Sequence, residues 1–191
     1  MKLIGMEKIK DGKYLKNYQL TYLNKAGKEK QYEIVSYSEL GGPEELGRNV
    51  NGLSIAAFYE GKLLLLKEFR MGVNRYIYNL CAGMLEPGET IEECMNRELY
   101  EETGLQVSRV IDILPPGFAA VAVSDIKTRV AFVEAEGEFS DHSSSNEEIK
   151  AAFYSREEVK ELLQKEEFST RAQLIAYFFS EGLLPGKEKA E

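Results

Sequence analysis

Residues 83–105 read GMLEPGETIEECMNRELYEETGL, and this stretch decides both the fold class and the chemistry open to the chain. Residues 87–88 are Pro-Gly, which is a turn signal. Thr90 followed by Glu93 has capping-box spacing and predicts a helix start, whereas Gly104 is a typical C-terminal stop. The stretch therefore predicts a turn followed by a short, well-delimited helix.

The predicted helix has one face that changes from apolar to acidic along its length. At about 100° per residue, Ile91, Cys94 and Met95 share this face, and we expect it to be buried. The next turns of the same face carry the carboxylates of Glu98, Glu101 and Glu102. Converging, half-buried carboxylates repel one another, and a divalent cation with oxygen ligands, Mg²⁺ or Mn²⁺ rather than zinc, compensates them. The alternative is a solvated acidic helix face that binds no metal.

The spacing of residues 83–105 is similar to the Nudix box of Nudix hydrolases and matches each of its fixed positions. The flanks, from about Asp11 to Phe179, resemble the ADP-ribose pyrophosphatase branch of that family. The resemblance implies an α/β fold, the Nudix α/β/α sandwich with a mixed sheet, carrying here an N-terminal β-hairpin extension. It also implies Mg²⁺-dependent or Mn²⁺-dependent cleavage of a nucleoside diphosphate linked to another moiety.

ADP-ribose, cleaved to AMP and ribose 5-phosphate, is the substrate that this resemblance favours. The alternatives are a nucleotide sugar such as GDP-mannose and a non-catalytic module that senses a nucleotide. Two departures from the branch leave the second moiety of the substrate open. Cys81 stands where the branch has a proline, and residues 118–123 form an apparent insertion before Ser124, with Ile126 where a glutamate is usual.

The resemblance also assigns roles to single residues. The implied metal ligands are the main-chain carbonyl of Ala82 and the carboxylates of Glu98, Glu101 and Glu102. Arg97 would hold these carboxylates in place through salt bridges, and Glu101 is a further candidate for the base. The residues implied in substrate binding are Arg70, Gly83 and Glu86.

Two of these positions have alternatives in the sequence itself. Arg70 ends an apolar strand, and its planar donor fork suits phosphate oxygens, but a salt bridge at the strand end would also use an arginine. Glu147 and Glu148 end the polar loop 137–148, where the resembling enzymes carry the glutamate that acts as base on the attacking water. The sequence does not choose between the two glutamates, and an ordinary acidic loop is the alternative.

Composition limits the partners and the compartment. The chain has 191 residues, of which 43% are hydrophobic, and a net charge of −8. This charge disfavours nucleic acid and anionic membranes as partners, whereas a metal can bridge an acidic protein to an anionic ligand. There is no evident signal peptide or membrane-spanning run, and Cys81 and Cys94 lack metal-type spacing, so we expect a cytoplasmic protein with reduced thiols.

The remaining elements follow from apolar patterns. Residues 13–24 and 29–37 predict a β-hairpin. The resembling enzymes exchange such a sheet between subunits, which suggests a homodimer; the alternative is a hairpin that packs on its own domain. We therefore divide the chain into an N-terminal β extension (1–45), a Nudix hydrolase domain (46–183) and a charged tail (184–191).

Within the main domain the apolar patterns predict five further strands and two further helices. The expected strands span 52–59, 62–70, 106–114, 127–134 and 149–154. The expected helices span 156–165 and about 170–180. In the last helix we expect four residues to face the sheet: Leu174, Ile175, Tyr177 and Phe178.

Overall fold

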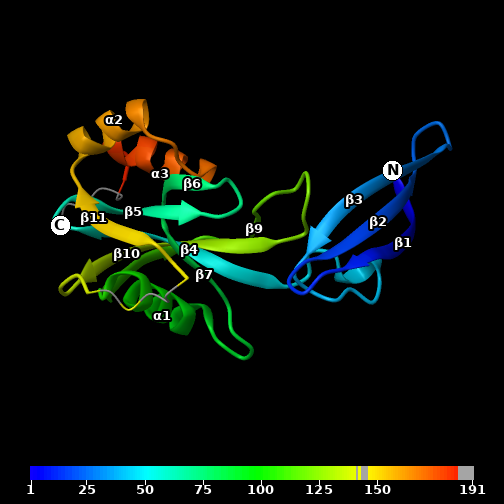
Figure 1. Cartoon of the computed structure of the whole chain (residues 1–191), viewed down its shortest axis with the longest axis horizontal. Helices are drawn as coiled ribbons and strands as arrows, with labels where there is room; N and C mark the ends of the chain where they lie inside the picture. Colours follow the sequence, from blue (N-terminus) through cyan, green and yellow to red (C-terminus); the bar gives the residue numbers. More distant parts are fainter. Residues whose placement is uncertain (141, 143–145, 185–191) are drawn as a thin grey trace. The chain divides into compact units, whose positions relative to one another are not determined.

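The computed structural model describes residues 1–140, 142 and 146–184 (Figure 1). The chain divides into two compact units. The first contains Met1–Asn51 and Pro116–Arg129, and the second contains Gly52–Pro115 and the residues from Val130 onwards. Of the expected charged tail at 184–191, only Leu184 lies within the described residues. No helix in the described part of the chain is long and apolar enough to cross a membrane.

The first unit is built on a three-stranded antiparallel sheet with the order β1-β2-β3. Its strands are β1 (Lys2–Asp11), β2 (Lys16–Leu23) and β3 (Glu29–Ser36). The predicted hairpin is β2-β3, but the expectation of a hairpin alone was wrong because β1 pairs with β2 along its length. Charged side chains make up half of β1, so its alternating pattern is weak, and pairing rather than composition defines this strand.

The segment 116–129, which contains the apparent insertion 118–123, packs against this first sheet. The amide of Val35 donates to the carbonyl of Val123 at 2.8 Å, and the Tyr32 hydroxyl donates to the carbonyl of Ala122. The amide of Gly47, which follows the 3₁₀ turn η1 (Pro43–Glu45), donates to Asp125 Oδ2 at 3.2 Å. The inserted segment therefore completes the first unit rather than extending the second.

The second unit contains a mixed sheet whose central strands run in the order β11-β5-β4-β10-β8. These strands are β4 (Val50–Tyr59), β5 (Lys62–Arg70), β8 (Gln106–Ile113), β10 (Lys127–Glu136) and β11 (Ile149–Tyr154). Two short strands of this unit lie off the path: β6 (Arg75–Asn79) and β7 (Cys81–Met84). The short strand β9 (Gly117–Phe118) belongs to the first unit, where it pairs with Lys127 and Thr128 at the start of β10. The strands predicted from apolar patterns are all present.

The hairpin of β4 and β5 splits a short way from its turn. The two strands pair only at Phe58 with Leu63 and at Tyr59 with Lys62. Beyond these pairs, β5 pairs with β6 and β4 pairs with β7. Between β6 and β7 the chain passes from the edge of β5 to the edge of β4, just before residues 83–105 begin. The split therefore determines where the acidic helix meets the sheet.

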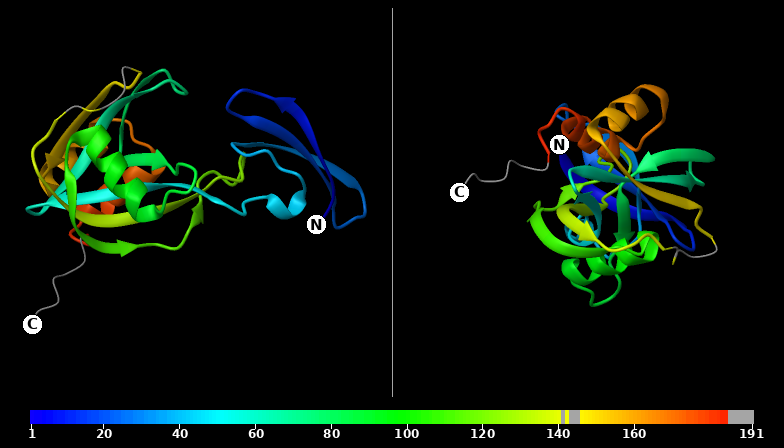
Figure 2. Two further views of the ribbon diagram at one scale, coloured as in Figure 1. Left: turned by 90° about the horizontal axis from the view of Figure 1, so that it is seen from below. Right: turned by 90° about the vertical axis from the view of Figure 1, so that its left-hand side faces the viewer.

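Helices cover both faces of this sheet (Figures 1 and 2). Helix α1 (Ile91–Thr103) lies on one face, and α2 (Arg156–Lys165) and α3 (Thr170–Ser180) lie on the other. Alternation along the strands separates two cores, because Leu53, Ile55 and Ala57 pack with α1 whereas Ala56 and Phe58 pack with α2 and α3. The sandwich is therefore the expected α/β/α arrangement, and residue parity tells which face a strand side chain occupies.

The helix boundaries follow the sequence signals. Thr90 caps α1 in a capping box with Glu93, and Gly104 ends the helix in the left-handed region at φ 79°. The expected inward face of α3 was wrong, since Leu174, Tyr177 and Phe178 are exposed and Ile175 is only half-buried. The residues that pack on the sheet are Ala172, Ala176 and Phe179. Because α3 is apolar around most of its circumference, its sequence does not indicate which face is inward; the small alanines let its backbone approach the sheet.

The two adjacent phenylalanines of α3 provide a test of this face. Phe179 is fully buried, so Phe179→Ala should lower the free energy of unfolding by about 3–5 kcal/mol through lost packing and a cavity. Phe178 is 41% exposed, and Phe178→Ala should change it by less than about 1 kcal/mol. Urea denaturation followed by circular dichroism measures both. Equal losses in the two variants would show that α3 is oriented differently.

Candidate active site

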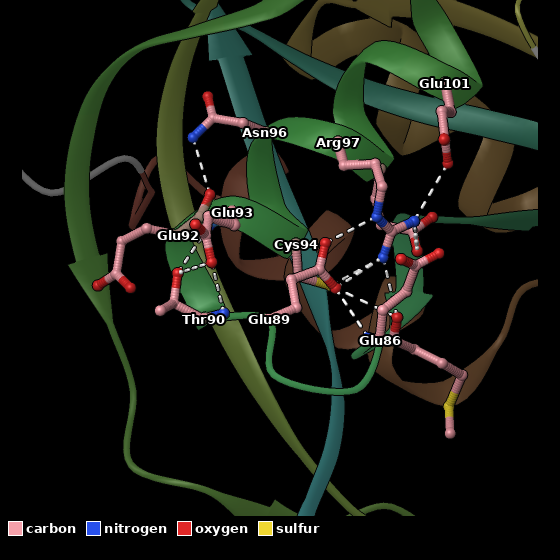
Figure 3. Close-up of polar contacts among 11 residues, drawn as sticks. Glu86, Glu89, Thr90, Glu92, Glu93, Cys94, Asn96, Arg97 and Glu101 are labelled. Carbon is pink, nitrogen blue, oxygen red and sulfur yellow. Dashed lines mark hydrogen bonds and ion pairs between the residues drawn. The ribbon is translucent and has the colours of Figure 1, made fainter.

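Arg97 lies at the centre of the polar contacts of α1 (Figure 3). Its Nε and Nη2 bind the two carboxylate oxygens of Glu89 at 2.7 and 2.9 Å. Its Nη1 donates to Glu98 at 2.7 Å and to Glu101 at 3.1 Å. The bidentate bond to Arg97 lowers the pKa of Glu89 to about 2. One guanidinium thus contacts three of the box carboxylates and holds them in defined positions.

The turn before α1 is closed by the same network. Glu89 Oε2 accepts a hydrogen bond from the amide of Glu86 at 2.9 Å, and Arg97 Nη2 donates to the carbonyl of Met84 at 3.0 Å. Gly88 takes φ 85°, which suits glycine, at the tip of this turn. The Glu86 side chain itself is exposed. The helix and the turn that leads into it are therefore connected by side chain to backbone bonds, as well as by the capping box.

Glu98 lies directly against the backbone of β7. A Cβ atom added at Gly83 would stand 1.7 Å from Cδ and Oε1 of Glu98, so any side chain there would displace the carboxylate. A Cβ atom at Gly52, on the neighbouring strand, would stand 2.2 Å from the carbonyl oxygen of Gly83. Burial raises the pKa of Glu98. The two glycines therefore make room for a carboxylate and a carbonyl that approach from opposite sides.

Glu102 is the most deeply placed carboxylate of the helix. Its Oε2 accepts a hydrogen bond from the amide of Ala82 at 3.1 Å. The amide and carbonyl of one strand residue point to the same edge, so the Ala82 carbonyl also lies on the side of Glu102. Burial raises the pKa of Glu102 to about 8, and the charges of Glu98 and Glu68 act in the same direction. A bound cation would remove this penalty.

The structure does not bring all the expected ligands together. Glu101 was expected on the inward stripe, but its side chain is 49% exposed, so its convergence with Glu98 and Glu102 was wrong. Glu101 lies at the edge of the acidic stripe of α1, where its carboxylate accepts a hydrogen bond from Arg97. Within the described residues, no three acidic, histidine or cysteine side chains are grouped to hold a metal. The oxygen donors around β7 are thus two carboxylates and main-chain carbonyls.

Glu68 is a member of this region that the sequence analysis missed. It is only 6% exposed, and its Oε1 accepts a hydrogen bond from Asn79 Nδ2 at 2.7 Å. Its Oε2 lies 3.6 Å from Arg70 Nη1. An acidic residue inside the apolar run of residues 62–70 was the available signal, because an unpaired charge in a buried strand is costly.

Parity along β5 places these residues relative to α1. Glu68 and Arg70 have the parity of Leu64 and Leu66, which pack in the α1 core. The Arg70 side chain, at the end of the strand, is 57% exposed. Arg70 is therefore on the sheet face that carries the box carboxylates, and it also makes the strand-end ion pair that was its alternative reading.

Glu148 occupies the other face. The amide of Phe69 donates to the carbonyl of Glu148 at 3.1 Å, which extends the β11-β5 ladder by one residue. Glu148 thus shares the face of Phe69, and its Oε2 accepts a hydrogen bond from the Tyr76 hydroxyl. Tyr76 contacts the Phe69 ring edge-on at 5.3 Å between centroids. These contacts hold Glu148 on the α2/α3 side of the sheet.

Comparison with known families agrees with this geometry. A NUDIX domain profile matches residues 48–178, which is more than half of the chain. The chain belongs to the NUDIX family. A solved structure described as an ADP compounds hydrolase superposes with a TM-score of 0.75 over 98% of this chain and 96% of that one, at 19% identity, and confirms the fold.

Two curated relatives are similar in sequence to this NUDIX chain. The ADP-sugar pyrophosphatase of Mus musculus is 29% identical over 132 residues, which is 69% of this chain and 60% of that protein. The ADP-ribose pyrophosphatase of Bacillus subtilis (strain 168) is 34% identical over 122 residues, which is 62% of this chain and 60% of that protein. The similarity to these two proteins therefore spans about 60% of their own length.

The raised pKa of Glu102 gives a test that needs no substrate. A carboxyl whose folded pKa, about 8, exceeds its unfolded value stabilises the metal-free protein below the unfolded pKa and loses this contribution as pH rises toward 8. Glu102→Gln, which cannot ionise, should therefore be more stable than the wild type at pH 9, by an amount on the order of a few kcal/mol. Near pH 5 the difference should shrink.

Urea denaturation in EDTA at both pH values measures this difference. Glu92→Gln, on the solvent side of the same helix, is the matched control and should show little pH-dependent difference. Destabilisation of Glu102→Gln at pH 9 would contradict this expectation. It would show that the ionised Glu102 does not suffer the desolvation penalty that the structure indicates.

Proposed function

We propose that this NUDIX protein hydrolyses the diphosphate of ADP-ribose to AMP and ribose 5-phosphate, with Mg²⁺ or Mn²⁺ as cofactor. The observation that carries the proposal is the pair of half-buried carboxylates, Glu98 and Glu102, packed against the backbone of Ala82 and Gly83. The names of the two curated relatives, an ADP-sugar and an ADP-ribose pyrophosphatase, support a diphosphate linked to adenosine on one side.

The residues at β7 fit a divalent cation by their chemistry. Every donor is an oxygen, as Mg²⁺ and Mn²⁺ prefer, and Glu102 is a desolvated carboxylate whose hydrogen bond comes from the neutral amide of Ala82. Glu98, Glu102 and the Ala82 carbonyl would hold the ion, with Glu101 as an outer ligand. When bound, the metal lowers the pKa of water and offsets charge on the diphosphate oxygens. Arg97 keeps Glu98 in position for this role.

On the substrate side, the Arg70 guanidinium would bind phosphate oxygens through its donor fork. Arg70 shares the α1 face with the carboxylates, which supports this role. Gly83 and Glu86 are the further substrate contacts that we propose. Arg70 already has one ion-pair partner, Glu68, and a phosphate would use its remaining donors.

For the base that takes the proton from water, we propose Glu147 rather than Glu148. Glu148 extends the strand ladder and is held by Tyr76 on the α2/α3 side. If the alternation of β11 is continued by two residues, Glu147 would face the α1 side, where the box carboxylates lie. Glu101, at the edge of the acidic stripe, is the other candidate for this role.

The proposal extends to assembly and location. The three-stranded sheet of the first unit would mediate a homodimer, and gel filtration with light scattering tests this. The buried, free thiols of Cys81 and Cys94 support a reducing, cytoplasmic location.

Loss of one carboxylate tests the metal-dependent hydrolysis. Glu102→Gln should lower kcat for ADP-ribose at least about 100-fold, because it removes a charged oxygen donor from the metal site. Release of inorganic phosphate after phosphatase coupling measures turnover, and a panel with GDP-mannose and ADP-sugars separates the substrates. Glu92→Gln is the control and should keep wild-type turnover. Full activity of Glu102→Gln, or equal activity without metal, would contradict the proposal.

The two loop glutamates make a second, paired test. Glu147→Gln should lower kcat by roughly 100-fold or more, as expected for loss of a general base, while the affinity for substrate stays near wild type. Glu148→Gln should keep most of the activity, because its carboxylate is bound by Tyr76 on the other face. Steady-state kinetics across pH 6–9 compares them. The opposite order of effects would assign the base to Glu148.

A further inference from the structure

We propose that Glu68 is a positioning residue, which fixes the guanidinium of Arg70 for contact with the phosphate groups of the substrate. This inference rests on the proposed function, because it takes Arg70 as a phosphate ligand. It assigns a purpose to the one buried charged side chain of β5, Glu68.

A buried carboxylate such as Glu68 needs a reason to be retained. Glu68 is 6% exposed, and leucine would fill the same strand position without the cost of desolvating a charge. Its hydrogen bond from the neutral Asn79 amide, at 2.7 Å, satisfies one oxygen but does not neutralise the charge. The cation paired with Glu68 is Arg70, whose side chain is mostly in solvent. The pair therefore joins a buried, immobile anion to an exposed cation.

The orientation of the Glu68 carboxylate is set from the other side of β6. Ser169 Oγ donates to Asn79 Oδ1 at 2.6 Å, which leaves Asn79 Nδ2 directed at Glu68. Ser169 is itself held, because its amide donates to the carbonyl of Tyr78 at 3.0 Å and its hydroxyl caps α3. The chain Ser169–Asn79–Glu68 thus anchors the carboxylate to the start of α3 and to β6.

With one oxygen held by Asn79, Glu68 presents its other oxygen to Arg70. The separation of 3.6 Å between Glu68 Oε2 and Arg70 Nη1 is that of an ion pair that restrains the guanidinium without saturating its donors. An arginine that is 57% exposed otherwise samples many rotamers, and ordering it on binding costs affinity. Glu68 holds the guanidinium in place before the substrate binds, which lowers this cost. Loss of Glu68 should therefore weaken substrate binding rather than slow the chemical step.

Substitution of Glu68 by glutamine tests this role with nearly the same volume. In Glu68→Gln the side-chain oxygen can still accept from Asn79, but an NH₂ group replaces the oxygen that faces Arg70. We expect KM for ADP-ribose to rise about tenfold with kcat within about twofold of wild type. In an Arg70→Ala background the same substitution should raise KM no further, because its effect passes through Arg70. Calorimetric titration of ADP-ribose in EDTA should show the same weakening without turnover.

The control and a second variant keep the test decisive. Glu134→Gln is the control. It breaks another Glu–Arg ion pair, between Glu134 on β10 and Arg109 on β8, and should change neither KM nor kcat. Asn79→Ala keeps the Glu68 carboxylate but removes the hydrogen bond to its Oε1, and should raise KM severalfold. This variant tests the proposal if Glu68→Gln does not fold. Unchanged KM in either variant, or an equal further loss in the Arg70→Ala background, would overturn the positioning role. An inactive wild type would instead refute the proposed function.

Discussion

The structure of this NUDIX chain depends on the desolvation of carboxylates against main chain at the split in its sheet. Glu98 rests on the Cα atom of Gly83, and Glu102 accepts a hydrogen bond from the amide of Ala82. Neither contact leaves room for a side chain on β7 at Gly83, and both withdraw charge from water. The free energy that this costs is offset partly by Arg97, which binds Glu98 and the turn before the helix. The rest of the offset is what a bound cation would supply.

The split between β4 and β5 is the architectural condition for this arrangement. A continuous ladder would use the strand edges for main-chain pairing and would leave no free amide for Glu102. Because β6 and β7 take up the two separated edges, the Ala82 amide is released to a side chain. The start of α3 then braces the same region, since Ser169 binds Asn79 and Arg171 donates to Ser54 on β4.

Local signals predicted the features that depend on neighbours in the sequence. The capping box at Thr90 and the stop at Gly104 are both determined within a few residues. The role of Glu68 was missed because its hydrogen-bond partner Asn79, which Ser169 orients, comes beside it only in the folded chain. The face on which Glu148 lies likewise needed the register of β11 against β5. The inward face of α3 needed the packing of its alanines, because apolar residues surround that helix.

The alternation of side chains along β5 and β11 determines which residues face α1. The period of two sends Glu68 and Arg70 to the α1 side, while Phe69, between them, joins Tyr76 and Glu148 on the other side. A shift of β11 by one residue would move Glu148 from the α2/α3 side to the α1 side. The hydrogen bond from Tyr76 to Glu148 opposes such a shift, since it is made only in the observed register. A contact outside the acidic site therefore helps to keep the order of residues within it.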